Sequence, residues 1–426
     1  MGPLLAFKPE KQEGAGKIER FASKPDHLAP KLKRLGHWSV LSCLLTIAAT
    51  LPAAALDIRA AVLRIDYPSL LPLSRMDLPG EDRAFAGGML ATEDNRTTGQ
   101  FLGHDFQTET VATTPEDARA DFQALVDAGY RLFVIVAEAE DLLALSDGAP
   151  ADTLLFNAWS GDVSLRSENC RANTLHVAPS DAMRADAVAQ FLAWKRWNRW
   201  FLIGGSNEKD IRLTQAYAAS AEKFGAQVVE SRTFEDTGGS RVSDSGHVLV
   251  QRQIPVFTQD AADHDVVVAA DASEVFAEYL PYHTWDAAPV AGSAGLRPLS
   301  WAPTHESWGA TQIQRRFEKL AGRYMAEADY QTWLSLRIIG EAVTRTGAAD
   351  AATLRTYILS DAFELAAFKG VPLTVRSWNG QVRQPLLLSN GRMTVSVSPQ
   401  EGFLHQTSPL DTLGLDASES SCKEFE

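Results

Sequence analysis

The feature that most constrains this chain is a regular alternation of short apolar runs with helix-like segments, which occurs twice in succession. In the first stretch the strand-length runs are residues 58–65, 106–111, 131–137, 153–157 and 173–178. A helix-like segment over 114–129 separates two of them, with Thr114 placed to begin it and Gly129 to end it. This β-α-β-α-β order predicts a parallel sheet with right-handed crossovers.

The alternation restarts near Pro179. Helix-like segments are predicted at 180–194, 209–225 and 272–280, and strands at 199–204, 227–234, 265–270 and 289–291. The strands of both stretches end in polar loops, which is where ligands bind in doubly wound sheets. The sequence therefore predicts an α/β chain with two successive, similar units.

The flanking segments complete this outline. Helices are predicted at 82–94, through much of 305–346 and at 351–360. Strands are predicted at 369–376 and 384–388, on either side of a turn at Asn379-Gly380. The tail from about residue 397 is rich in Ser, Pro, Gly and acidic residues and is expected to be loop.

The N-terminal region reads as a leader. Lys31, Lys33 and Arg34 precede an apolar run over about 38–51, and small residues at 53–55 follow it, as in a secretory signal peptide. A membrane anchor is the alternative, although the run is shorter than the roughly 20 residues that span a bilayer. Lipidation at Cys43 is a further alternative. We expect residues 1–55 to be removed, leaving an exported, periplasmic protein with no membrane insertion.

Charge and cysteine content fit export. The chain has 40 basic and 54 acidic residues, and removal of the leader shifts its net charge from −14 to −18. This balance argues against a nucleic-acid partner, which needs clustered cations. Cys170 and Cys422 remain after cleavage, and in an oxidising compartment we expect them to form a disulfide. Two free thiols are the alternative.

Motifs that carry chemistry are missing from the sequence. There is no phosphate-binding G-x-x-x-x-G-K-[ST] and no G-x-G-x-x-G after a strand. The histidines form no H-x-x-x-H pair, so no metal site is expected, and Glu138, Glu140 and Asp141 read as a solvated loop. We therefore predict a binding protein rather than an enzyme, with no cofactor of its own.

Tryptophans and cations suggest what could be bound. Trp159 and Trp301 fall in predicted loops after strands, Lys209 follows the strand at 199–204, and Arg297 lies four residues before Trp301. Tryptophan stacks on flat rings and arginine binds carboxylates through two parallel hydrogen bonds. Structural packing of each Trp is the alternative interpretation.

Several segments carry a family resemblance. Residues 176–192 (HVAPSDAMRADAVAQFL), 281–296 (PYHTWDAAPVAGSAGL) and 368–388 (FKGVPLTVRSWNGQVRQPLLL) resemble periplasmic type I solute-binding proteins of the leucine/isoleucine/valine-binding kind. They look most like the branch associated with pyrroloquinoline quinone (PQQ)-dependent alcohol dehydrogenase systems. The resemblance covers about residues 56–426. It implies two Rossmann-like lobes with parallel central sheets, joined by three crossovers.

The resemblance also implies domain limits. Lobe 1 would comprise 56–178 plus 304–380, lobe 2 would comprise 179–303 plus 381–410, and 411–426 would be a C-terminal tail. Residues 1–55 are the extension and signal peptide.

A ligand site follows from the same resemblance. Ala158, Trp159 and Ser160 match the family loop that grips a ligand carboxylate through backbone N–H and hydroxyl groups. The facing contacts would come from the segments that contain Asn207, Lys209, Asp271, Ser293, Arg297 and Trp301. Arg64 and Tyr67, after the first strand, are rim candidates. Ser293 stands where amino-acid binders carry an acidic residue, which favours a ligand without an ammonium group.

Three functions remain open at this stage. The first is capture of a small anionic ligand, best PQQ, for ABC-type uptake or delivery to an alcohol-oxidising system. The second is binding of an amino acid or small carboxylic acid for an ABC importer. The third is a non-transport accessory or sensor of a quinoprotein dehydrogenase. The partners are accordingly a small molecule and either an ABC permease or the dehydrogenase.

Overall fold

The structure is a computed structural model that describes residues 55–68, 78–236 and 250–425. Most of the predicted signal peptide, including the basic cluster and the apolar run, lies outside the described residues. None of the helices in the described ranges combines the length and apolarity needed to cross a bilayer.

The first sheet has the order β2-β1-β3-β4-β5 and is parallel throughout. Its strands are β1 (Asp57–Ile65), β2 (Asp105–Thr113), β3 (Leu132–Val136), β4 (Leu154–Asn157) and β5 (Thr174–His176). Successive side chains of β1 enter different cores because side chains alternate across a strand. Val62 belongs to one core cluster and Leu63 to the other. Apolar residues on both faces therefore require helices on both faces.

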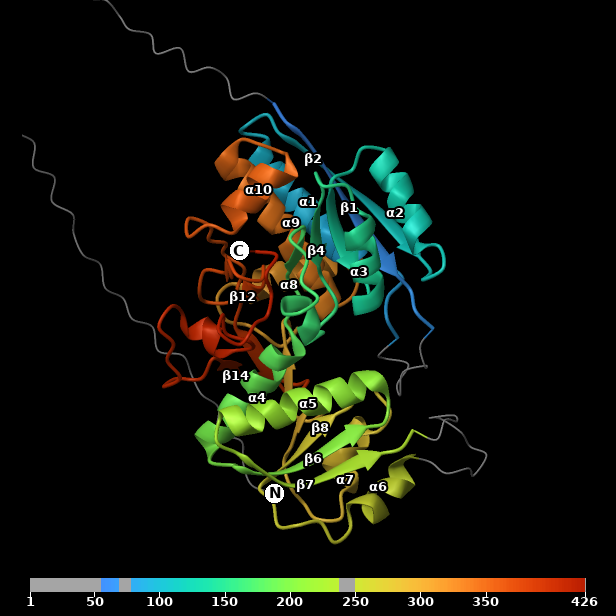
Figure 1. Cartoon of the computed structure of the whole chain (residues 1–426), viewed down its shortest axis with the longest axis vertical. Coiled ribbons are helices and arrows are strands. Elements are labelled where there is room, and N and C mark those ends of the chain that lie inside the picture. Colours follow the sequence, from blue (N-terminus) through green and yellow to red (C-terminus); the bar gives the residue numbers. More distant parts are fainter. Residues whose placement is uncertain (1–54, 69–77, 237–249, 426) are drawn as a thin grey trace, which may run out of the picture. The chain divides into compact units, whose positions relative to one another are not determined.

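Those helices come from two distant parts of the chain. Helices α2 (Ala118–Asp127) and α3 (Ala139–Gly148) contribute to the core on the Leu63 face. Helices α1 (Phe85–Gly99), α8 (Ala310–Ala321), α9 (Glu327–Thr346) and α10 (Ala351–Ile358) contribute to the Val62 face (Figure 1). Helix α9 packs along α1 although more than 200 residues separate them. We call this sheet with its helices the first lobe.

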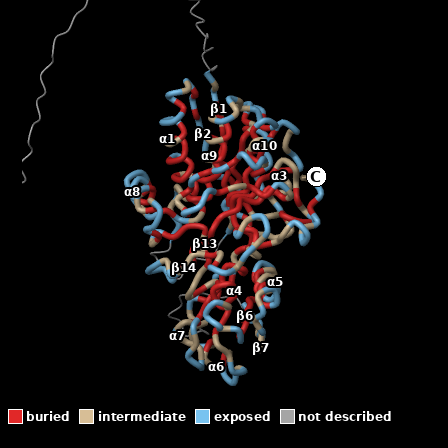
Figure 2. Tube along the Cα trace, turned by 90° about the vertical axis from the view of Figure 1, so that its left-hand side faces the viewer, coloured by how far each residue is buried: buried red, intermediate tan, exposed pale blue. Residues whose placement is uncertain are grey.

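The second lobe is built around a parallel sheet of order β7-β6-β8-β9. Its strands are β6 (Arg199–Gly205), β7 (Gln227–Phe234), β8 (Val266–Ala270) and β9 (Val290–Gly292). Helices α4 (Asp181–Lys195) and α5 (Glu208–Lys223) cover one face (Figure 1). Helices α6 (Val250–Thr258) and α7 (Leu280–His283), with the 3-10 turn η3 (Ala277–Tyr279), cover the other. The central strands β3 and β8 are buried along their whole length, whereas the edge strands β2 and β7 are largely exposed or half-buried. Figure 2 shows buried segments in red inside both lobes.

The chain passes between the lobes three times, at about residues 177–180, 300–309 and 384–385. Two small antiparallel sheets lie along these passages. One is β10 (Arg297–Leu299), β13 (Leu386–Ser389) and β14 (Thr394–Ser398), and the other is the pair β11 (Thr374–Val375) and β12 (Val382–Arg383). The predicted α/β architecture with two parallel sheets and three crossovers is confirmed.

Local predictions were wrong in several places. The carboxylates Glu140 and Asp141 lie in the first turn of α3 rather than in a loop. The helix expected at 272–280 is replaced by the turn η3 and the short α7. The helical run 305–346 breaks at Gly322, which has a φ of +69° and ends α8. Strands β10 and β14 and helix α6 were not predicted, because each is short or carries a proline.

The expected disulfide is present. Cys170 and Cys422 are bonded across a sequence separation of 252 residues, with their Cα atoms 5.6 Å apart. The bond attaches the end of the C-terminal tail to the first lobe.

Candidate ligand-binding site

The loop that follows β4 uses its backbone donors internally. Asn157 is fully buried, and its Oδ1 accepts the N–H groups of Trp159 at 3.1 Å and Ser160 at 2.9 Å. The N–H of Ala158 donates to the carbonyl of Ile135. The backbone N–H donors that the resemblance assigned to a ligand carboxylate therefore already have acceptors. What the loop offers to a ligand is the indole ring of Trp159, whose residue is 38% exposed.

A buried arginine fixes this loop to the passages between the lobes. The guanidinium of Arg166 donates to the carbonyls of Ser160, Asp162 and Ala178 and to Oε1 of Gln381. Burial lowers its pKa to about 9. One side chain thus holds the Trp159 loop, the first passage at Ala178, and Gln381, which precedes the third passage.

Arg83 stacks against this indole. Its Cζ lies 5.3 Å from the centroid of the Trp159 ring, within the range of a cation–π contact. Among the described residues no hydrogen-bond acceptor or ion-pair partner faces its guanidinium. Burial lowers the pKa of Arg83, and the nearby charge of Arg64 lowers it further. The carboxylates of Asp66 and Asp329 lie near enough to raise this pKa in part, but neither forms a hydrogen bond or ion pair with Arg83 among the described residues, which leaves its guanidinium donors open to an anion.

Arg64, predicted at the rim of the ligand site, is engaged with its own loop. Its guanidinium binds both carboxylate oxygens of Asp66, at 2.7 and 2.9 Å, and the carbonyls of Glu81 and Arg83 at 2.8 Å. With its donors so engaged, Arg64 holds the loop that carries Arg83 rather than facing a ligand.

Arg83 and Trp159 line a cavity of about 920 Å³. One wall is the loop 78–83. A second is formed by residues 297–303, which comprise β10 and the start of the second passage. The third is formed by residues 318–328, from the end of α8 to the start of α9. Three residues predicted from the sequence lie in it: Trp159, Arg297 and Trp301. A cavity of this size is in the range that encloses a small organic ligand.

The other two arginines of the cavity have carboxylate partners. Arg323 binds Asp82 at 2.8 Å and Asp329 at 2.7 Å, and these contacts raise its pKa. Arg297 lies 3.3 Å from Glu278 in an exposed pair. Arg83 is therefore the cavity-lining arginine without such a partner among the described residues.

Trp301 is a core residue. It is 1% exposed, its ring stacks on Tyr330 at 4.8 Å, and its Nε1–H donates to Gln314. Trp301 also lines the cavity, but with its ring already stacked on Tyr330 and 1% exposed, contact with a ligand stays a prediction.

Two predicted residues of the second lobe hold their own backbone. The Asp271 carboxylate is buried and accepts the N–H groups of Val275, Phe276 and Ala277 at 2.6–2.8 Å. Burial raises its pKa despite these bonds. The Ser293 hydroxyl accepts the N–H of Asp271. Neither side chain lines the cavity that contains Arg83.

The remaining predicted residues lie near Glu138. Lys209 of α5 donates to Glu138 Oε1 at 2.7 Å, and the Trp159 indole N–H donates to the same oxygen at 3.4 Å. The Tyr67 hydroxyl donates to Asp141 and accepts the N–H of Glu138; burial raises its pKa. Asn207, the N-cap residue of α5, donates to Asp210. Glu138 thus links Trp159 of the first lobe to Lys209 of the second lobe.

Sequence reasoning missed Arg83 and Glu138. Arg83 stands just before α1, beside two charged residues, Glu81 and Asp82, and such a cluster reads as a solvated surface. Glu138 was assigned to a solvated loop. The one sequence signal for Arg83 is its position in the loop between the first strand and the first helix, where ligands bind in doubly wound sheets.

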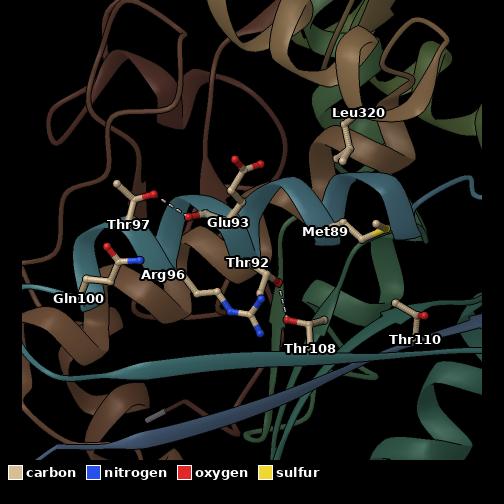
Figure 3. A pocket seen from close by; sticks show the side chains of 9 residues that line it. All are labelled: Met89, Thr92, Glu93, Arg96, Thr97, Gln100, Thr108, Thr110 and Leu320. Atoms are coloured by element: carbon tan, nitrogen blue, oxygen red, sulfur yellow. Dashed lines mark hydrogen bonds between the residues drawn. The ribbon is translucent and has the colours of Figure 1, made fainter.

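A further cavity of about 480 Å³ lies between α1 and the edge strand β2. Figure 3 shows Arg96 and Thr92 directed from α1 towards β2, where the Thr92 and Thr108 hydroxyls are 2.6 Å apart. Arg96 donates to the carbonyl of Phe106, which occupies part of its guanidinium. This cavity contains none of the residues predicted from the sequence.

Comparison with known proteins defines the fold class. Residues 81–253, about two-fifths of the chain, match the family described as Periplasmic binding protein. The chain resembles a branched-chain amino acid ABC transporter ligand-binding protein from Burkholderia xenovorans, with a TM-score of 0.66 and 14% identity. That alignment covers 87% of this chain and 100% of the other. The protein therefore has the type I periplasmic binding protein fold.

Other solved structures share this fold. The leucine-, isoleucine-, valine-, threonine- and alanine-binding protein from Brucella ovis aligns with a TM-score of 0.62 and 15% identity over 78% of this chain and 89% of its own. A solute-binding protein from R. palustris in complex with benzoate aligns with a TM-score of 0.60 and 12% identity, over 86% and 99%. No curated protein sequence matches the chain significantly.

Proposed function

We propose that this protein is a periplasmic solute-binding protein that captures a small anionic ligand in the Arg83–Trp159 cavity for an ABC-type importer. The observation that carries the proposal is the guanidinium of Arg83, half-buried over an indole at the wall of a cavity of about 920 Å³. A ligand carboxylate would accept hydrogen bonds from the Arg83 guanidinium, which faces no acceptor among the described residues. The indole of Trp159 would pack on the apolar or aromatic part of the ligand. The protein would perform no chemistry of its own.

The charges of the cavity bear on the choice of ligand. Since Arg297 and Arg323 already face carboxylates, Arg83 is the cation best placed to meet a first ligand carboxylate. A monocarboxylate fits this arrangement with the least rearrangement. Structures of the same fold hold leucine and benzoate, both of which carry one carboxylate. Aromatic monocarboxylic acids are therefore the class that we favour.

PQQ is the candidate that the sequence resemblance names. It is a planar tricarboxylate, so Trp159 could stack on it, but its three carboxylates would need Arg297 and Arg323 to leave their present partners. We keep PQQ in the proposal as the ligand whose binding would require that rearrangement.

Thermal unfolding and Trp fluorescence of the purified protein with benzoate, leucine or PQQ would test the proposal. A ligand at 100 times its Kd stabilises the folded state by about 2.7 kcal/mol, and only a bound ligand does so. We expect benzoate to raise the unfolding temperature and to change Trp fluorescence. Failure of all three carboxylates to bind would refute a carboxylate-binding function. Binding of PQQ alone would refute the preference for monocarboxylates.

A further inference from the structure

The C-terminal segment 409–425, which we call the strap, is anchored first on the second lobe. Leu413 is fully buried in the core beneath α4 and α5. The N–H of Gly414 donates to Oδ2 of Asp186 at 2.7 Å, and Lys223 donates to the Gly414 carbonyl at 2.9 Å. Asp186 is itself buried and also binds Lys223 at 2.8 Å. These contacts fix the strap to both helices of that face.

Its second anchor lies beside the third passage. Asp411 is buried, and its carboxylate accepts from Nε of Arg376 and from Nε of Arg383, both at 2.8 Å. Arg376 also donates to the carbonyls of Leu410, Leu413 and Leu415. Buried charges are stable only when they are paired and hydrogen-bonded, so this group resists displacement.

The third anchor is on the first lobe. Cys422 is bonded to Cys170, and the neighbouring Ser421 donates its N–H to the Ser167 hydroxyl at 3.0 Å. The ring of Phe425 packs against the first-lobe core, with the Arg355 guanidinium 4.9 Å from its centroid. The strap therefore joins the two lobes by a route separate from the three passages of the main fold.

We propose that the strap is a tether that limits how far the two lobes separate, and that the Cys170–Cys422 disulfide keeps its first-lobe end attached. Lobe separation about the passages is how proteins with two hinged domains admit a ligand. A fourth connection held by a covalent bond at one end and by buried ions in the middle restricts that motion. Breaking the disulfide leaves only noncovalent contacts at the first-lobe end, so wider opening becomes accessible.

Interlobe distances in the ligand-free protein test the tether directly. Spin labels on keto amino acids introduced at exposed Ala120 of α2 and Ala219 of α5 report the separation without using cysteines. We expect the Cys170→Ser/Cys422→Ser variant to show a broader distribution with a longer mean distance. We also expect hydrogen exchange at Gly414 to be about tenfold faster. Unchanged distances would overturn the proposal.

A matched control separates the tether from a general loss of stability. Leu142→Ala weakens the first-lobe core without touching the strap. It should leave the interlobe distribution and Gly414 exchange as in the parent protein. An equal change in this control would also overturn the proposal.

Should the double variant fail to fold, the folded parent can be treated with a dithiol. The reagent supplies two electrons and two protons, the S–S bond breaks and two thiols form. Alkylation verifies that both thiols are present, and the distance measurement then decides as before. Because no ligand is used, the outcome is independent of the proposed carboxylate binding.

Discussion

The loops that follow the strands of the two lobes use polar side chains alike but differ in what else they present. In the second lobe, Asp271 and Ser293 satisfy backbone groups of their own loop. In the first lobe, Asn157 does the same for its loop, but the adjacent Trp159 and Arg83 are left facing a cavity. A polar side chain at the end of a strand can thus serve its own loop in either lobe, and its hydrogen-bond partners show when it does.

The largest effect that we expect is on stability, from the second lobe. Asp271→Ala leaves three buried N–H groups without an acceptor, and such groups cost about 1–3 kcal/mol each, so we expect a loss of about 3 kcal/mol or more. Urea unfolding measures it. The exposed Asp286→Ala is the control and should leave the free energy of unfolding unchanged. A stable Asp271→Ala protein with weakened ligand binding would reverse the assignment.

The next largest effect should be on binding, from the first lobe. Arg83→Gln removes the charge that would meet a ligand carboxylate, and charge-assisted hydrogen bonds contribute about 1.5–3 kcal/mol. We expect benzoate affinity to fall roughly 10- to 100-fold by isothermal titration. Arg297→Gln, in the same cavity but paired with Glu278, is the matched control and should change the affinity little. Equal losses in both variants would show that general cavity charge, not Arg83, matters.

Trp159→Leu tests whether the indole ring of the first lobe contacts the ligand. Removing the ring surface should weaken an aromatic ligand by about 1 kcal/mol and should affect leucine less. The control is Trp285→Leu, which is exposed in the second lobe and lies outside the cavity lining. If the two variants bind benzoate alike, Trp159 does not contact the ligand.

The smallest effect concerns the contact between the lobes. Lys209 and Glu138 form a partly exposed pair, and such pairs contribute about 0.2–1 kcal/mol. Lys209→Gln should therefore change ligand affinity less than fivefold, and the difference should shrink as salt is added. Arg212→Gln removes a second ion pair between the lobes, with Asp162, and should likewise cause a small, salt-sensitive change in ligand affinity. A large, salt-insensitive loss for Lys209→Gln would make this lysine a direct ligand contact.

Sequence periodicity was sufficient for the architecture because the buried strands are continuous apolar runs. Residues 131–137 and 265–270 show this most clearly, and β3 and β8 lie within them. Strand β10 has three residues, one of them proline, and therefore lacks the continuous apolar run that marks β3 and β8. Helix α3 was missed because its first turn is acidic, which stabilises a helix N-terminus as readily as it solvates a loop.

The site was less predictable than the fold. Trp159 and Arg297 could be placed near one cavity because both follow strands, but the sequence does not reveal which cations have partners. Arg64 and Arg83 are both arginines near the end of the first strand, and only the three-dimensional contacts show that one holds the loop and the other is available. Trp301 also lines that cavity, but the sequence could not show how deeply it is buried, because its packing partners Gln314 and Tyr330 lie on α8 and α9, which come later in the chain.

The bonds of Arg166 have a consequence for how the chain acquires its final form. This buried side chain, from the first half of the sequence, takes Gln381 as one of its partners. The loop that presents Trp159 therefore cannot reach its final arrangement until the chain beyond residue 381 has been made and has returned to the first lobe. A fragment ending at residue 178 would lack that partner and α9, so it should be an unstable intermediate that is vulnerable to proteases until synthesis is nearly complete.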